Sequence, residues 1–97
     1  MGGVMKHYII VKFKNDFVYT EHIDDISAIF AKTLDIEGIT AVDIKKSNST
    51  RENRYDLMIE IDLEEAALPL YDKSAPHLLW KEKYGGYIAE KTIFDCD

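Results

Sequence analysis

Apolar positions that alternate with polar ones indicate strands in this chain, and apolar positions three or four residues apart indicate helices. The first such segment, residues 7–14, is rich in β-branched and aromatic residues and predicts a strand. Tyr8 and Ile10 stand on one face of this strand. Alternate residues form the other face, namely His7, Ile9, Val11 and Phe13. Because both faces carry apolar groups, we expect both to become covered.

A helix is predicted over residues 21–35, because apolar residues recur there at steps of three and four. They form one stripe, made of Ile23, Ile26, Phe30 and Leu34. Acidic residues near the start of this segment and Lys32 near its end match the charges that the helix dipole favours. Gly38 is the expected point at which the chain turns away from the helix.

Two strands joined by a polar hairpin loop are predicted next, over residues 39–46 and 55–63, with the loop at 47–53. The second of these strands alternates clearly. Its apolar face consists of Tyr55, Leu57, Ile59 and Ile61. Met58 lies among the acidic residues of the opposite face, which indicates that this face is also partly covered.

The last third of the chain predicts two short helices and a strand. Residues 64–72 form the first helix, in which Pro69 must lie in the first turn or cause a kink. Ser74 can cap the second helix, with Pro76 in its first turn and a pair of glycines at its end. Residues 87–95 form the final strand.

The predicted order is therefore β-α-β-β-α-β, with the last helix in two pieces. This is the ferredoxin-like pattern of the α+β class, in which helices cover one face of an antiparallel sheet. The other face stays open and carries apolar side chains, namely Tyr8, Ile10, Met58 and Phe94. Because a single chain would expose this patch, we expect a homodimer that forms through the open sheet face.

Length and charge narrow the classes of protein and partner. The 97 residues fit one domain, which we place at residues 5–97, with residues 1–4 expected to be a tag or disordered. A hydrophobic fraction of 46% and a charged fraction of 31% are typical of a globular protein. The net charge of −6 argues against nucleic acid or an anionic membrane as a partner.

The residues that usually hold metals and cofactors are sparse. Cys96 is the only cysteine, which excludes an intrachain disulfide and a cysteine-based metal site. The three histidines show no ligand spacing on one element, and Gly85-Gly86 lacks the strand and helix context of a nucleotide loop. We therefore expect no metal and no cofactor. The absence of a long apolar run and of a signal peptide predicts a cytoplasmic protein that does not enter membranes.

Three motifs occur in a characteristic order. The first strand carries a histidine, a hydrophobic run and Phe13-Lys14, and a later strand begins at Tyr55. Tyr71 then precedes His77 by six residues. With the closing segment 91–95, this order resembles the stress-responsive A/B-barrel domain (Dabb) family of the dimeric α/β-barrel superfamily. Ser74 stands where the family motif has its first histidine, and the proline falls one place later than usual.

The resemblance implies a ferredoxin-like protomer whose sheet pairs with that of a second copy to form a barrel. Most members of the family have no assigned chemistry. A plant polyketide cyclase in the family is similar in carrying a tyrosine and a histidine at the places of Tyr71 and His77, and a histidine at the place of His7. By this analogy, the three residues would line a cavity between the sheet and the helices.

His77 is a candidate general base on physical grounds. The Ser74 cap and Pro76 place it at the N-terminal end of a helix, where the dipole disfavours an imidazolium and leaves the ring neutral. Such a ring can take a proton from a carbon acid, and Tyr71 could stabilise the resulting enolate. The alternative is that His77 bonds a neighbouring loop and packs against Trp80 or Lys81.

Two functions remain open from the sequence. In the first, the chain is an uncharacterised homodimer that binds a small apolar molecule in the cavity between sheet and helices. In the second, it is a polyketide-cyclase-like enzyme that uses His77 as general base and Tyr71 to stabilise an enolate. His7 is a third candidate catalytic residue, although a lone histidine on an apolar face is more often a satisfied core residue.

Overall fold

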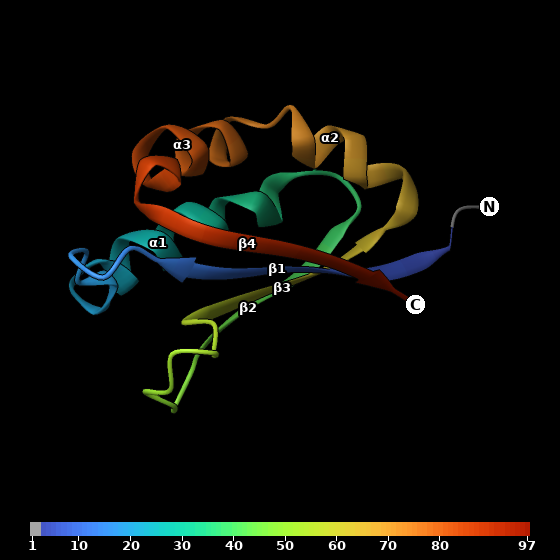
Figure 1. The fold of residues 1–97 in the computed structure, drawn as a ribbon. Coiled ribbons are helices and arrows are strands. Elements are labelled where there is room, and N and C mark those ends of the chain that lie inside the picture. The colour runs from blue at the N-terminus through green and yellow to red at the C-terminus, as the bar shows by residue number, and fades with distance from the viewer. Residues whose placement is uncertain (1–2) are drawn as a thin grey trace.

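One four-stranded antiparallel sheet organises the protein, and helices cover one of its faces (Figure 1). The computed structural model describes residues 3–97. The strands lie in the order β2-β3-β1-β4. Their bounds are β1 (Val4–Phe13), β2 (Ile39–Lys46), β3 (Leu57–Glu64) and β4 (Ile88–Cys96). The helices are α1 (Ile23–Ala31), α2 (Leu68–Asp72) and α3 (Ala75–Tyr84). This order confirms the predicted ferredoxin-like arrangement of the α+β class.

The strand boundaries differ from the predicted ones by three residues or fewer. β1 begins at Val4, which pairs with Glu64. Val4 therefore belongs to the sheet, although we placed residues 1–4 before the domain. Gly3 also contacts the fold, because its carbonyl accepts a hydrogen bond of 2.8 Å from the backbone of Glu65. Residues 1 and 2 lie outside the described residues.

The predicted strand faces explain where the core forms. Alternate residues of the two central strands are buried beneath the helices, namely His7, Ile9, Val11 and Phe13 of β1 and Leu57, Ile59, Ile61 and Leu63 of β3. The helices contribute Phe30 from α1 and Trp80 from α3, whose ring centroids lie 5.1 Å apart. Burial of these apolar groups is the main favourable contribution to folding.

The segment predicted as one helix over 21–35 contains α1 between two 3₁₀ turns, Tyr19–His22 and Lys32–Asp35. Leu34 does not join the buried stripe, because 47% of it is exposed. A 3₁₀ turn advances side chains faster around the axis than an α-helix does, so Leu34 leaves the apolar face. Thr33 is buried there instead, and its hydroxyl donates a 2.5 Å hydrogen bond to the carbonyl of Phe30.

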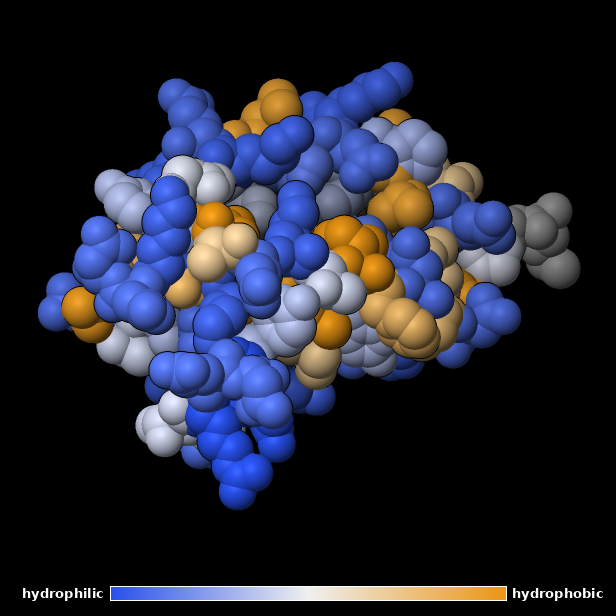
Figure 2. All heavy atoms as spheres, in the orientation of Figure 1, coloured by the Kyte–Doolittle hydropathy of each residue, from blue (hydrophilic) through white to orange (hydrophobic). Residues whose placement is uncertain are grey.

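β4 is the edge strand next to β1, and the helices leave most of it exposed. Ile93 points toward the helical side and Phe94 toward the open face, with 46% and 56% of each residue exposed. Figure 2 shows apolar patches between the helical layer and the sheet on a surface that is otherwise mostly polar. This edge of the sheet therefore presents apolar groups on both of its faces.

None of the helices found within residues 3–97 has the length and apolar character that crossing a membrane requires.

Gly38 is the one described residue with a left-handed backbone, at φ +94°, and it provides the turn into β2. A Cβ atom at this position would lie 2.8 Å from the Cβ of Ala67, which is buried. Both the backbone conformation and the close approach therefore require glycine.

We predict that Gly38→Ala lowers the free energy of unfolding by about 1–3 kcal/mol, because it adds backbone strain to a steric clash. Urea unfolding followed by circular dichroism measures this loss. Gly86→Ala is the matched control, since a Cβ there meets nothing within 4 Å. Equal stability of the two variants would contradict the prediction.

Candidate functional site

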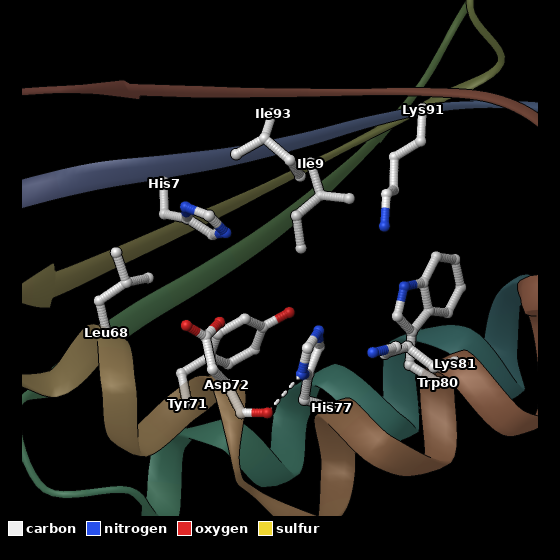
Figure 3. Close-up of a pocket in the computed structure, with 10 residues that line it drawn as sticks. All are labelled: His7, Ile9, Leu68, Tyr71, Asp72, His77, Trp80, Lys81, Lys91 and Ile93. Carbon is white, nitrogen blue, oxygen red and sulfur yellow. Dashed lines mark hydrogen bonds between the residues drawn. The ribbon is translucent and has the colours of Figure 1, made fainter.

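A cavity of about 280 Å³ lies between the sheet and the short helices α2 and α3 (Figure 3). β1, β4, α2 and α3 each contribute side chains to its wall. The lining residues are His7, Ile9, Leu68, Tyr71, Asp72, His77, Trp80, Lys81, Lys91 and Ile93. The structure thus brings together all three candidate residues of the sequence analysis, His7, Tyr71 and His77, around one space.

The turn between α2 and α3 places Tyr71 next to His77. The Ser74 hydroxyl donates a 2.7 Å hydrogen bond to the carbonyl of Tyr71 and accepts one of 3.3 Å from the backbone N–H of His77. The predicted N-cap is therefore confirmed. Pro76 lies in the first turn of α3, where its missing N–H costs nothing. The rings of Tyr71 and His77 consequently lie 4.6 Å apart, centroid to centroid.

The His77 ring is oriented by a hydrogen bond to its own turn. Its Nδ1 lies 2.9 Å from the carbonyl oxygen of Asp72. Because a carbonyl oxygen only accepts, Nδ1 carries the hydrogen, and a neutral ring then has its lone pair on Nε2. Figure 3 shows this second nitrogen pointing into the cavity, beside the hydroxyl of Tyr71. His77 therefore bonds the neighbouring turn, as the alternative in the sequence analysis expected. Its other nitrogen also faces the cavity.

The Tyr71 hydroxyl is buried without a hydrogen-bond partner among the described residues. Only 1% of this residue is exposed, and its ring is held between His7 and His77. Burial, together with the nearby Asp72 carboxylate, raises the pKa of the Tyr71 phenol, so the group remains a protonated donor. Leaving such a hydroxyl unsatisfied costs about 1–3 kcal/mol.

His7 lies on the cavity side of β1, opposite Asp95 of β4 in the strand register. Its Nδ1 lies 2.5 Å from Oδ1 of Asp95, and it is only 6% exposed. A carboxylate accepts this bond, so Nδ1 donates and Nε2 points toward the cavity (Figure 3). The Asp95 carboxylate fixes the orientation of the ring in the same way that a second ligand shell orients a metal-bound histidine.

The sequence analysis missed Asp95 and the lysines of the cavity. Asp95 and Lys91 are four residues apart on β4, so they share the face that points to the helices. Once β4 is paired with β1, the register sets His7 opposite Asp95 and Val11 opposite Lys91. The alternation of β4 together with this pairing would have identified both residues.

The arrangement combines a hydrogen donor with a base in one small space. Tyr71 offers an unpaired O–H, and His77 offers a lone pair on Nε2. A second imidazole, that of His7, faces the same cavity. Between residues 3 and 97, no group of three or more histidine, cysteine or acidic side chains is placed to hold a metal ion.

Comparison with known proteins gives a clear result for the fold. No family model matches the chain, and no curated protein is similar to it in sequence. A dimeric ferredoxin-like protein of unknown function from Thermobifida fusca superposes with a TM-score of 0.83 at 12% identity, over 98% of this chain and 91% of that one. A Dabb family protein with a ferredoxin-like fold from Mesorhizobium loti gives a TM-score of 0.68 at 14% identity, over 98% and 96%.

A third solved structure is the hydroxynitrile lyase from Passiflora edulis, with a TM-score of 0.76 at 13% identity over 98% of this chain and 93% of that one. At these identities the likeness concerns the fold. The resemblance to the stress-responsive A/B-barrel family is therefore confirmed at the level of the ferredoxin-like protomer.

The unpaired hydroxyl of Tyr71 leads to a prediction about stability. Tyr71→Phe removes a buried donor that has no partner, so we predict that the free energy of unfolding stays the same or rises by up to about 1 kcal/mol. Tyr84→Phe is the matched control, because the Tyr84 hydroxyl donates to the carboxylate of Asp25 and its loss should lower stability. Urea unfolding of both variants measures the difference, and a larger loss for Tyr71→Phe than for Tyr84→Phe would refute the prediction.

Proposed function

We propose that the cavity binds a small carbonyl compound and that His77 removes a proton from the carbon next to the carbonyl group. The observation that carries this proposal is the Tyr71 hydroxyl, which is buried, has no partner among the described residues and points into the cavity beside Nε2 of His77. A ligand oxygen at this place would satisfy the hydroxyl. The same ligand would then hold its neighbouring carbon close to the histidine.

The reaction follows from these two groups. Tyr71 donates a hydrogen bond to the carbonyl oxygen of the substrate. His77 takes the proton of the adjacent C–H bond on Nε2, and the bond's electron pair moves toward the oxygen to form an enolate. Negative charge grows on the oxygen during this step, so the hydrogen bond from Tyr71 strengthens as the transition state forms. Return of the proton completes an exchange reaction. If the enolate instead attacks a second carbonyl of the same substrate, a C–C bond forms and the resulting alkoxide takes the proton from His77.

The carbonyl of Asp72 stabilises the charge that His77 acquires, against the helix dipole that favours the neutral ring. When Nε2 takes a proton the ring becomes positive, and Nδ1–H already points at the carbonyl oxygen of Asp72. This carbonyl dipole is fixed before the reaction, so no reorganisation is needed when the charge appears. Ser74 holds the turn in place through its bonds to Tyr71 and to the backbone of His77.

His7 serves as a second polar contact for the substrate. Asp95 holds its ring so that Nε2 faces the cavity, while the edge of the ring packs against Tyr71 with a centroid distance of 5.7 Å. We assign His7 the role of orienting the substrate rather than that of the base. It lies on the sheet, whereas the unpaired hydroxyl and the nitrogen next to it both belong to the helical wall.

The size of the cavity limits the substrate. Its volume of about 280 Å³ is just below the usual range of ligand sites, roughly 300–1,000 Å³. Apolar groups from Ile9, Leu68 and Ile93 line it together with the polar ones, so a small molecule with one apolar side fits the wall. A hydroxynitrile lyase shares the fold, which supports the view that this protomer can house an enzyme site.

Proton abstraction is tested directly by isotope exchange. Butanone and 4-oxopentanoate are incubated with the protein in D₂O. Proton NMR follows the loss of the signals of the hydrogens on the carbons next to the ketone, as deuterium replaces them. We predict that the protein accelerates exchange of at least one of them, and that His77→Gln and Tyr71→Phe each slow it by about 100-fold or more. Lys14→Gln, a change on an exposed residue that does not line the cavity, should leave the rate unchanged.

Exchange by His77→Gln at the wild-type rate would remove His77 from the mechanism. If the wild-type protein binds these ketones but does not accelerate exchange, the cavity is a binding site without catalysis. The first function considered from the sequence, a homodimer that binds a small molecule in the cavity, would then hold.

A homodimer that forms through the open sheet face is the second part of the proposal. The side chains of Tyr8 and Phe94 meet on that face, with centroids 6.1 Å apart, and Ile10 and Met58 are cross-strand neighbours. Phe94 is 56% exposed. Ion pairs from Lys6 to two acidic residues of β3 flank this apolar group. The solved structures from Thermobifida fusca and Bacteroides fragilis are described as dimeric, which supports the assignment.

We predict that the wild-type protein has the mass of two chains in light scattering at micromolar concentration. Phe94→Asp should yield single chains, because it puts a charge into the apolar centre of the interface. Leu78→Asp is the control, since Leu78 is equally exposed, at 54%, but lies on α3 and away from the open sheet face. A wild-type mass of one chain, or dimers of Phe94→Asp, would overturn this part of the proposal.

A further inference from the structure

We infer that the substrate carries a carboxylate and that Lys81 and Lys91 bind it at the end of the cavity that includes Trp80. This inference deepens the proposed function, since it gives the ketone a second, charged group and therefore makes the substrate a small oxo acid. It rests on the distribution of charged side chains along the cavity wall. These side chains have no role in the proposed proton transfer.

The two lysines approach the cavity from opposite walls. Lys91 extends from β4 and Lys81 from α3, and Figure 3 shows both ammonium groups directed into the space beside Trp80. Among residues 3–97 neither lysine forms an ion pair or a side-chain hydrogen bond, whereas Lys6 and Lys83 each bind a carboxylate. Both lysines are exposed, and in a chain with net charge −6 two unpaired cations that line one cavity form a local site for an anion.

The cavity is polarised from one end to the other. Asp72 is its only acidic lining residue, and its carboxylate lies beside Tyr71 on the side away from the lysines (Figure 3). An anion is therefore attracted to the lysine end and repelled from the Asp72 end. This gradient orients a substrate with one charged end and one neutral end.

The donors at the lysine end fit a carboxylate. Lys81 and Lys91 supply two ammonium groups, and the indole nitrogen of Trp80 faces the same space in Figure 3. The ten lining residues include no arginine and no glycine, so the forked guanidinium and the loop of backbone N–H groups that commonly hold phosphate are not part of this wall. A single planar anion with two oxygens matches the available donors best.

This placement assigns a direction to the substrate. The carboxylate lies between Lys81 and Lys91, the ketone oxygen accepts from Tyr71, and the carbon between the two groups faces Nε2 of His77. The charged group binds equally in the ground state and the transition state, so it contributes to affinity and orientation rather than to the chemical step. Loss of one lysine should therefore weaken binding more than it slows proton transfer.

Trp80 is the only tryptophan of the chain and lines the cavity, so its fluorescence reports binding. We propose to titrate the protein with 4-oxopentanoate and 5-oxohexanoate, each beside its methyl ester, with calorimetry as a second readout. Each ester keeps the ketone but lacks the charge. We expect at least one acid to bind about tenfold more tightly than its ester, and this preference to shrink as salt is added.

Lys81→Gln and Lys91→Gln should each lower the affinity for the acid by roughly five- to tenfold and leave that for the ester unchanged. Lys81→Arg and Lys91→Arg keep the charge and should each retain most of the preference for the acid. The matched control Lys14→Gln removes the same charge from the exposed residue that follows β1 and should have no effect. The inference fails if acid and ester bind alike, if neither binds, or if Lys14→Gln weakens the acid as much as the cavity variants do.

The outcome separates this inference from the proposed function. His77→Gln should keep the preference for the acid while losing isotope exchange, because His77 does not touch the carboxylate. Preferential binding of the acid without exchange would support the anion site and reject the proton transfer. Exchange of butanone at the same rate as 4-oxopentanoate, with equal affinities, would support the proton transfer and reject the anion site.

Discussion

The hydroxyl of Ser74 is the contact on which the candidate site depends. It ends α2 by donating to the carbonyl of Tyr71 and starts α3 by accepting from the backbone of His77. The seven-residue segment that carries the phenol and the imidazole, Tyr71 to His77, is thus folded back on itself. Because the next carbonyl, that of Asp72, is left free to accept from the His77 ring, the same turn that positions the two side chains also selects the nitrogen that faces the cavity.

The sheet completes what the turn begins. β1 and β4 bring His7 and Asp95 to the opposite wall, and the pairing of these strands orients the His7 ring by a carboxylate. The cavity remains open because α2 and α3 are short and cover little of β4. Tyr71 consequently has a buried hydroxyl with no partner among the described residues, whereas most other buried residues are apolar. Such local costs are typical of functional sites.

Much of the fold could be predicted from the sequence, because the strands alternate and one face of β3 is apolar at every second residue. The N-cap at Ser74 could also be predicted from the sequence. The family resemblance further predicted that His7, Tyr71 and His77 line one cavity. Leu34 was placed wrongly, since apolar spacing does not distinguish the last α-helical turn from a 3₁₀ turn. Asp95 was missed because its partner His7 lies on another strand, and the cavity lysines were missed because strand register and helix packing decide which side chains line the cavity.

The central claim is that His77 presents an unprotonated Nε2 to a cavity in which Tyr71 has an unpaired hydroxyl. Nitrogen-15 NMR of the histidine rings reads the tautomer of His77 directly. The structure predicts that the neutral ring carries its hydrogen on Nδ1, which donates to the carbonyl of Asp72, and that the Nε2 signal shifts when 4-oxopentanoate binds. A neutral ring with its hydrogen on Nε2 would contradict the account, because the nitrogen that faces the cavity could then not act as a base.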